Sequence, residues 1–141
     1  MLTGISHLIS PKLLKVLSEM GHGDEIVLAD ANFPTETFGK RAVRADGIAG
    51  ADLLNAILPL FPLDQYDTSH FVLMEVIPGD PYKPLVWEDY RRVLAAHDPQ
   101  ATITHMERFA FYERAKKAYA VVATGEKAQY ANIILKKGVV R

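Results

Sequence analysis

The chain is 141 residues long, with 49% hydrophobic residues, 23% charged residues and no cysteine, a composition typical of one globular domain. Sixteen Lys and Arg residues against seventeen Asp and Glu residues give a formal net charge of −1, which argues against nucleic acid or an anionic membrane as a partner. The absence of cysteine excludes disulfide bonds, a cysteine-based zinc site and a thiol nucleophile.

In chain order, the first predicted helix begins with Pro11 after the cap residue Ser10 and is closed by Gly21. The apolar run 25–29 follows directly and predicts a strand buried on both faces. A more exposed strand over 41–44 and a helix over 51–58, ended by Pro59, come next.

The apolar run 71–77 is the strongest strand signal, and the loop that stops it contains two prolines. A helix over 84–97, a strand over 102–106, a helix over 109–117 and strands over 119–123 and 132–135 complete the chain. Because strands alternate with helices, the sequence predicts an α/β fold, with a mostly parallel sheet and helices on both faces. We expect one domain over residues 1–141.

No apolar run reaches 18 residues before Pro, Gly or a charge interrupts it, and the first residues lack a basic leader region. We therefore expect a cytoplasmic protein without a membrane segment. The five histidines show no metal-ligand spacing, so we expect no metal site.

Asp30 directly follows the buried strand over 25–29. Ligands of open α/β sheets bind beyond the C-terminal ends of strands, so a binding role for Asp30 stands beside the plainer role of a turn cap. His22 lies between Gly21 and Gly23, which leaves the imidazole room to approach a ligand. An exposed histidine in a helix-ending loop explains the same pattern. The two glycines precede a strand instead of following one, which argues against a dinucleotide site.

Arg108 follows one predicted strand, and Tyr130 and Asn132 begin another. Together with His22 and Asp30, these side chains supply donors and acceptors that suit a polyhydroxylated ligand, provided that the fold brings them together.

Four segments carry a more specific resemblance: residues 21–25 (Gly-His-Gly-Asp-Glu), 29–34 (Ala-Asp-Ala-Asn-Phe-Pro), 124–126 (Thr-Gly-Glu) and 130–135 (Tyr-Ala-Asn-Ile-Ile-Leu). In this order and at these separations they resemble the fucose mutarotase and ribose pyranase family. The resemblance covers essentially the whole chain. It implies an isomerase without cofactor or metal that interconverts sugar anomers or ring forms by ring opening and closure.

The resemblance also implies site residues. The catalytic histidine falls on His22, which would act as general acid and base because an imidazole of ordinary pKa exchanges protons near neutral pH. The substrate-binding carboxylate falls on Asp30, and further sugar contacts fall on Arg108, Tyr130, Ala131 and Asn132. Tyr119 is an additional candidate for the same pocket.

Arginine at position 108, together with Asn32-Phe33-Pro34, is similar to the fucose-type branch, so L-fucose is the expected substrate. The family resemblance further implies a ring-shaped homo-oligomer, commonly a decamer, with the site completed across a subunit boundary. Two alternatives stay open: ribose pyranase-type interconversion of ring forms, and a non-catalytic monosaccharide-binding or regulatory protein.

Overall fold

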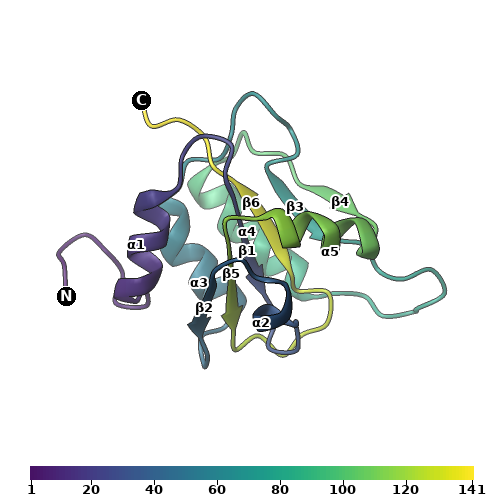
Figure 1. Ribbon diagram of the computed structural model, residues 1–141. Helices are drawn as coiled ribbons and strands as arrows, with labels where there is room; N and C mark the ends of the chain where they lie inside the picture. Colours follow the sequence, from purple (N-terminus) through teal and green to yellow (C-terminus); the bar gives the residue numbers. More distant parts are fainter.

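A single six-stranded sheet organises the chain, which a computed structural model describes over residues 1–141. The strand order is β2-β5-β1-β6-β3-β4 (Figure 1). The strands are β1 (Glu25–Ala29), β2 (Ala42–Ala45), β3 (Phe71–Met74), β4 (Thr104–Met106), β5 (Ala120–Thr124) and β6 (Ile133–Lys136). The helices are α1 (Pro11–Glu19), α2 (Thr35–Phe38), α3 (Gly50–Ile57), α4 (Val86–His97) and α5 (Arg108–Lys117), with a 3₁₀ turn, η1 (Leu58–Leu60), after α3.

Strand direction confirms the predicted fold class. The pairs β1–β5, β2–β5 and β3–β4 are parallel, and β6 is antiparallel to both of its neighbours, β1 and β3. Five strands therefore run in one direction, and only β6 runs against them. As a result, the residues that precede β6 lie at the same edge of the sheet as the residues that follow the five parallel strands.

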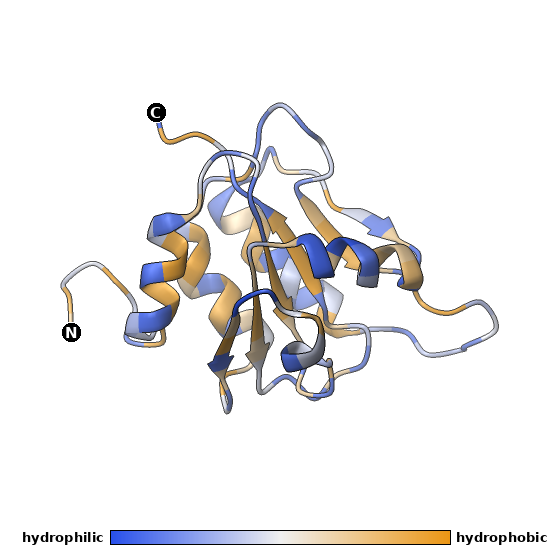
Figure 2. Ribbon diagram, in the orientation of Figure 1, coloured by the Kyte–Doolittle hydropathy of each residue, from blue (hydrophilic) through white to orange (hydrophobic).

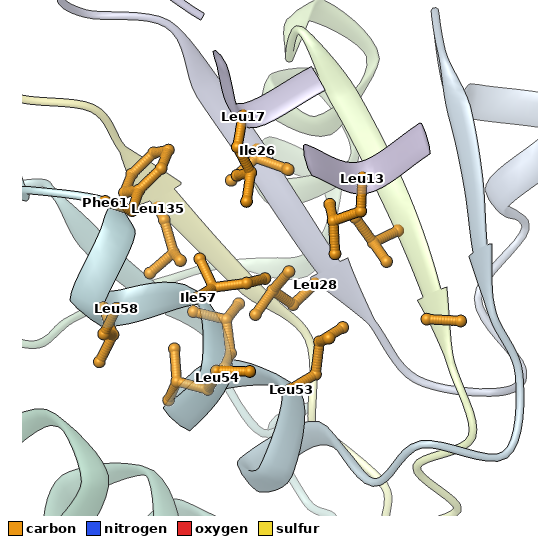
Figure 3. Packing of buried hydrophobic residues seen from close by; sticks show 14 of the residues in the cluster. Leu13, Leu17, Ile26, Leu28, Leu53, Leu54, Ile57, Leu58, Phe61 and Leu135 are labelled. Carbon is orange, nitrogen blue, oxygen red and sulfur yellow. The ribbon is translucent and has the colours of Figure 1, made fainter. Parts of the chain in front are cut away.

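Helices cover both faces of the sheet, because alternate residues of each strand point to opposite sides. Ile26 and Leu28 of β1 belong to the larger apolar cluster, which contains buried residues of α1, α3 and α4. Val27 and Ala29 belong to the smaller cluster, together with buried residues of α5. The central strands are mostly apolar, whereas β2 and β4 also carry hydrophilic residues, and helices such as α1 turn their apolar residues inward (Figure 2). Figure 3 shows side chains of α1, β1 and α3 meeting in the larger cluster.

Helix α1 shows why the sequence folds locally as predicted. The Ser10 hydroxyl accepts a hydrogen bond from the Leu13 amide at 3.1 Å, and Pro11 occupies the first turn. Leu13, Val16 and Leu17 are buried on one side of the helix. None of the helices in the chain combines the length and the apolar character needed to cross a bilayer.

Three features differ from the sequence-based expectation. Helix α2 was not predicted, because its four residues are too few for an apolar period. The expected strand over 71–77 ends at Met74, because the chain then leaves the sheet and the Ile77 amide donates to the Tyr130 hydroxyl at 3.4 Å. The antiparallel direction of β6 was also not predicted.

Candidate functional site

Asp30 and Asn132 meet at the edge of the sheet where β1 ends and β6 begins. The Asp30 amide donates a hydrogen bond to Oδ1 of Asn132 at 2.8 Å. Asn132 is only 5% exposed, so its amide group is fixed in place. Its Nδ2 donates to no other group of the chain, and this donor is free to bind a ligand.

The Asp30 carboxylate is held in a partly buried turn. Its Oδ1 accepts a hydrogen bond from the Asn32 amide at 2.9 Å. Burial raises the pKa of Asp30 above its ordinary value, although hydrogen bonds from Asn32, Phe33 and Asn132 partly oppose the shift. Asp30 is therefore a turn cap that also presents an incompletely solvated carboxylate at the strand ends.

Tyr130 has a backbone conformation that side chains rarely adopt. Its φ is 58°, and it is the only residue other than glycine with a positive φ. Strained backbone of this kind persists only where the surroundings hold it, and here two donors from α4 do so. The Trp87 indole donates to the Tyr130 carbonyl at 2.7 Å, and the Tyr90 hydroxyl donates to the Ala131 carbonyl at 2.8 Å.

The Tyr130 side chain reaches a residue that the sequence analysis did not single out. Its hydroxyl donates to Oδ2 of Asp80 at 2.5 Å. This bond is the main cause that raises the pKa of Tyr130 and lowers the pKa of Asp80. The two prolines that flank Asp80 were the only sequence signal for an ordered loop here.

Arg108 begins α5, directly after the strand β4, at the same edge of the sheet. Its guanidinium lies 4.5 Å from the centre of the Phe109 ring. Arg108 is also close enough to Tyr130 for its positive charge to act on the phenol, in the direction that lowers the pKa. The structure thus gathers at one edge five predicted residues, here called the strand-end cluster: Asp30, Arg108, Tyr130, Ala131 and Asn132.

His22 lies at the opposite end of β1 from this cluster. Its Nε2 is 3.1 Å from Oδ1 of Asp64, and its ring centre is 5.6 Å from that of Tyr66. The His22 side chain is 47% exposed, whereas that of Asp64 is 4% exposed. We call His22, Asp64 and Tyr66 the histidine cluster.

Asp64 is the buried anchor of the histidine cluster. Its Oδ1 also accepts a hydrogen bond from the Tyr66 amide at 3.1 Å. Burial by itself raises the pKa of Asp64, but the hydrogen bonds from Tyr66 and His22 outweigh it and lower the pKa below its ordinary value. An ionised carboxylate only accepts hydrogen bonds, so the proton shared with His22 belongs to Nε2, and Nδ1 is left for other partners.

The two clusters do not meet within one chain. The five residues of β1 separate them, and at about 3.3 Å per residue this strand alone spans roughly 15 Å. His22 was grouped with Asp30 on the sequence alone, and the structure places the two residues at opposite ends of β1. Asp64 also lines a hollow of the molecular surface, together with Asp67, His70 and Thr102.

Tyr119, the additional pocket candidate from the sequence, lies at the end of β1 where His22 lies and not beside Asp30. Tyr119 precedes β5, and β5 runs parallel to β1. Its amide donates to the Glu25 carbonyl at 2.8 Å, at the start of β1. The Arg41 guanidinium lies 3.9 Å from the centre of its ring. Tyr119 therefore lies at the end of β1 opposite Asp30.

Residues 124–126 hold the strand ends together. The Thr124 hydroxyl donates to the Ala29 carbonyl at 2.7 Å, and the Glu126 carboxylate accepts a hydrogen bond from the Gly50 amide at 3.1 Å, at the start of α3. No group of three or more His, Asp or Glu side chains is placed to hold a metal ion.

The chain is similar to known proteins over its whole length. It is 53% identical to the fucose mutarotase from Streptococcus pneumoniae, solved in complex with L-fucose, with 99% of this chain and 100% of that chain covered and a TM-score of 0.95. FucU from Bifidobacterium longum is also 53% identical, with 98% and 99% covered and a TM-score of 0.95. RbsD from Bacillus subtilis, solved with D-ribose, is 23% identical over 100% of both chains with a TM-score of 0.76, which shows a shared fold alone.

A family comparison gives the same result. Residues 3–140 match the RbsD / FucU transport protein family, which confirms the resemblance found in the sequence. This chain therefore belongs to the RbsD / FucU family.

Proposed function

We propose that this chain is an isomerase, an L-fucose mutarotase that interconverts the α and β anomers of the sugar. The observation that carries the proposal is the 53% identity, over the whole length of both chains, to the fucose mutarotase solved with L-fucose. Conversion of one anomer into the other requires the sugar ring to open and then to close on either face of the aldehyde. On opening, the anomeric hydroxyl loses a proton and the ring oxygen gains one, so positioned acid and base groups accelerate the reaction.

The strand-end cluster is assigned the role of binding the sugar. The Asp30 carboxylate would accept hydrogen bonds from sugar hydroxyls, while the Arg108 guanidinium and Nδ2 of Asn132 would donate them. The rigid backbone at Tyr130 and Ala131 supports this assignment, because a site on held backbone keeps its geometry when the ligand arrives.

His22 is assigned the proton exchange with the ring oxygen. Its hydrogen bond to Asp64 supports this role, because the buried carboxylate orients the imidazole. With Nε2 bonded to Asp64, Nδ1 is the atom that would face the sugar. Asp64 is then a positioning residue for His22.

The separation of the two clusters supports an assembly in which one subunit supplies His22 and a neighbour supplies the strand-end cluster. A contact between two different surfaces of the same chain joins copies head to tail, and it closes into a ring when the rotation allows. Exposed aromatic side chains that could contribute to such a contact lie at both clusters. Tyr66 is exposed beside His22. Tyr82 and Phe109 are exposed beside Tyr130 and Arg108, respectively. A decameric ring and a cytoplasmic location stay predictions.

Exchange spectroscopy on equilibrated L-fucose tests the proposal. We expect catalytic amounts of the protein to speed exchange between the two anomers without changing their ratio, and His22→Ala to remove most of the acceleration while the sugar still binds. D-ribose in the same experiment separates the fucose activity from the ribose pyranase type. A non-catalytic binding protein would select one anomer and leave the exchange rate unchanged, which would refute the proposal.

A further inference from the structure

The hydrogen bond between Tyr130 and Asp80 has no part in the roles assigned above. The two side chains come from segments 50 residues apart, and their oxygens are 2.5 Å apart. Oδ1 of Asp80 is already occupied, because it accepts the Tyr82 amide at 2.9 Å. Oδ2 therefore has the Tyr130 hydroxyl as its partner in the chain.

The direction of this bond decides what Tyr130 offers to a sugar. A carboxylate only accepts hydrogen bonds, so the phenol must donate its single proton to Asp80. The Ile77 amide donates to the phenol oxygen at 3.4 Å. Towards a ligand, the oxygen of Tyr130 consequently presents a lone pair and no proton.

Resting on the proposed function, we propose that Asp80 is a positioning residue that makes the Tyr130 hydroxyl the proton acceptor for the anomeric hydroxyl of the sugar. This inference names the base that works opposite His22. The positive charge of Arg108 acts on Tyr130 and favours the release of the phenol proton to Asp80.

These groups account for every proton that moves when the sugar ring opens. The anomeric hydroxyl gives its proton to the Tyr130 oxygen as Tyr130 passes its own proton to Oδ2 of Asp80. The electrons of the anomeric O–H bond form the carbonyl at C1. The bond between C1 and the ring oxygen breaks, and its electron pair stays on the ring oxygen, which takes a proton from His22. Ring closure reverses each transfer.

The backbone is arranged to hold this pair. Tyr130 has the positive φ of 58°, and the Asp80 loop contains Gly79 with a φ of 92° between Pro78 and Pro81. The Tyr82 ring also packs against Tyr130, with the two ring centres 5.9 Å apart. These constraints fix where the phenol oxygen lies before the sugar arrives.

Asp80→Asn tests the inference, because asparagine keeps the shape of the aspartate side chain and reverses the direction of its hydrogen bond with Tyr130. Its Oδ1 still accepts the Tyr82 amide, but its Nδ2 donates to Tyr130 and turns the phenol proton outward. We expect the exchange rate at saturating L-fucose to fall about 10²-fold, the low end of what a positioned proton transfer contributes, with KM nearly unchanged.

Asp98→Asn is the matched control. Asp98 accepts the amide of Gln100, two residues further on, at 3.2 Å, which is the same local turn without a tyrosine partner. We expect this variant to retain the wild-type rate. Thermal unfolding of both variants shows whether each is folded.

Tyr130→Phe and the Asp80→Asn/Tyr130→Phe double variant complete the test. If the two residues act as one unit, each single variant and the double variant lose the rate to about the same degree. The inference would be overturned if the rate loss of the double variant were the product of the two single losses. A change in KM alone, or a wild-type rate in Asp80→Asn, would also overturn it. An inactive wild-type protein, or a fully active His22→Ala variant, would instead refute the proposed function itself.

Discussion

Single aspartates of this chain combine a local and a long-range role. Five of them accept a hydrogen bond from the backbone amide two residues further along: Asp30, Asp64, Asp67, Asp80 and Asp98. This local turn needs no tertiary contact. At Asp64 and Asp80, the tertiary structure adds a second partner, a histidine and a tyrosine. The same aspartate can therefore cap a turn and also serve as a functional carboxylate.

Asp30→Asn is expected to stabilise the protein while it weakens sugar binding. Burial raises the pKa of Asp30, so ionisation costs stability as the pH rises through the pKa of the folded state. Asparagine is never ionised, and we expect a gain at pH 7 of about 0.5–2 kcal/mol in the free energy of unfolding. The gain should vanish below the ordinary aspartate pKa of about 3.9. Urea unfolding at both pH values measures it, and a loss of stability at pH 7 would contradict the expectation.

Arg108→His is expected to shift sugar preference away from L-fucose and towards D-ribose. A hydrogen bond from a charged group contributes about 1.5–3 kcal/mol, so its loss should lower kcat/KM for fucose at least about tenfold. Exchange rates measured with both sugars give the ratio. Arg44→His, at an exposed arginine paired with Asp46, should leave the ratio unchanged. An unaltered ratio in Arg108→His would remove Arg108 from substrate selection.

At the scale of elements, the segment between η1 and β3 carries Asp64 and Tyr66, and contacts with the sheet and α5 hold it in place. Arg114 of α5 pairs with Glu25 of β1, and its guanidinium also donates to the hydroxyl and the carbonyl of Ser69. Both side chains of the Arg114–Glu25 pair are less than one-fifth exposed. Lys136 of β6 pairs with Asp67 at 2.8 Å.

Arg114→Ala is expected to destabilise the fold by about 3 kcal/mol, because it leaves the poorly solvated Glu25 carboxylate without a partner. Arg92→Ala is the control, since it breaks only an exposed pair with Asp89 on α4 and should cost less than about 1 kcal/mol. Denaturant unfolding gives both values, and hydrogen exchange should show faster opening of residues 64–70 in Arg114→Ala. Equal losses in the two variants would contradict this account of the segment.

At the scale of the whole molecule, the sheet holds the two clusters apart, and subunit mixing tests whether neighbours join them. His22→Ala and Asp30→Ala should each be inactive alone. In mixed assemblies formed from equal amounts of the two variants, a site shared between neighbours should combine an intact His22 with an intact Asp30 in about one quarter of cases, because each intact residue is present in about half of the subunits. We expect activity to return towards that fraction after co-refolding. No recovery in assemblies shown to contain both variants would contradict a shared site.

Much of the fold follows from local pattern. The strand over 25–29 was predicted with its observed bounds, and the helix beginning at Pro11 was predicted from its cap, its proline and its apolar spacing. The four-residue helix α2 was missed, because one turn has no period to detect. The direction of β6 was missed because strand direction depends on pairing partners far away in the chain.

The sequence by itself determined the α/β class and the family, since these depend on periodicity, turn chemistry and motif order, and the family resemblance supplied the predicted site residues. Only the tertiary structure decided which residues meet. It placed Asp30 beside Asn132 across 102 positions, bonded Tyr130 to Asp80 and His22 to Asp64, and set the histidine cluster at the opposite end of β1. Such contacts arise from sheet order and chain reversal at β6, which short-range sequence patterns do not contain.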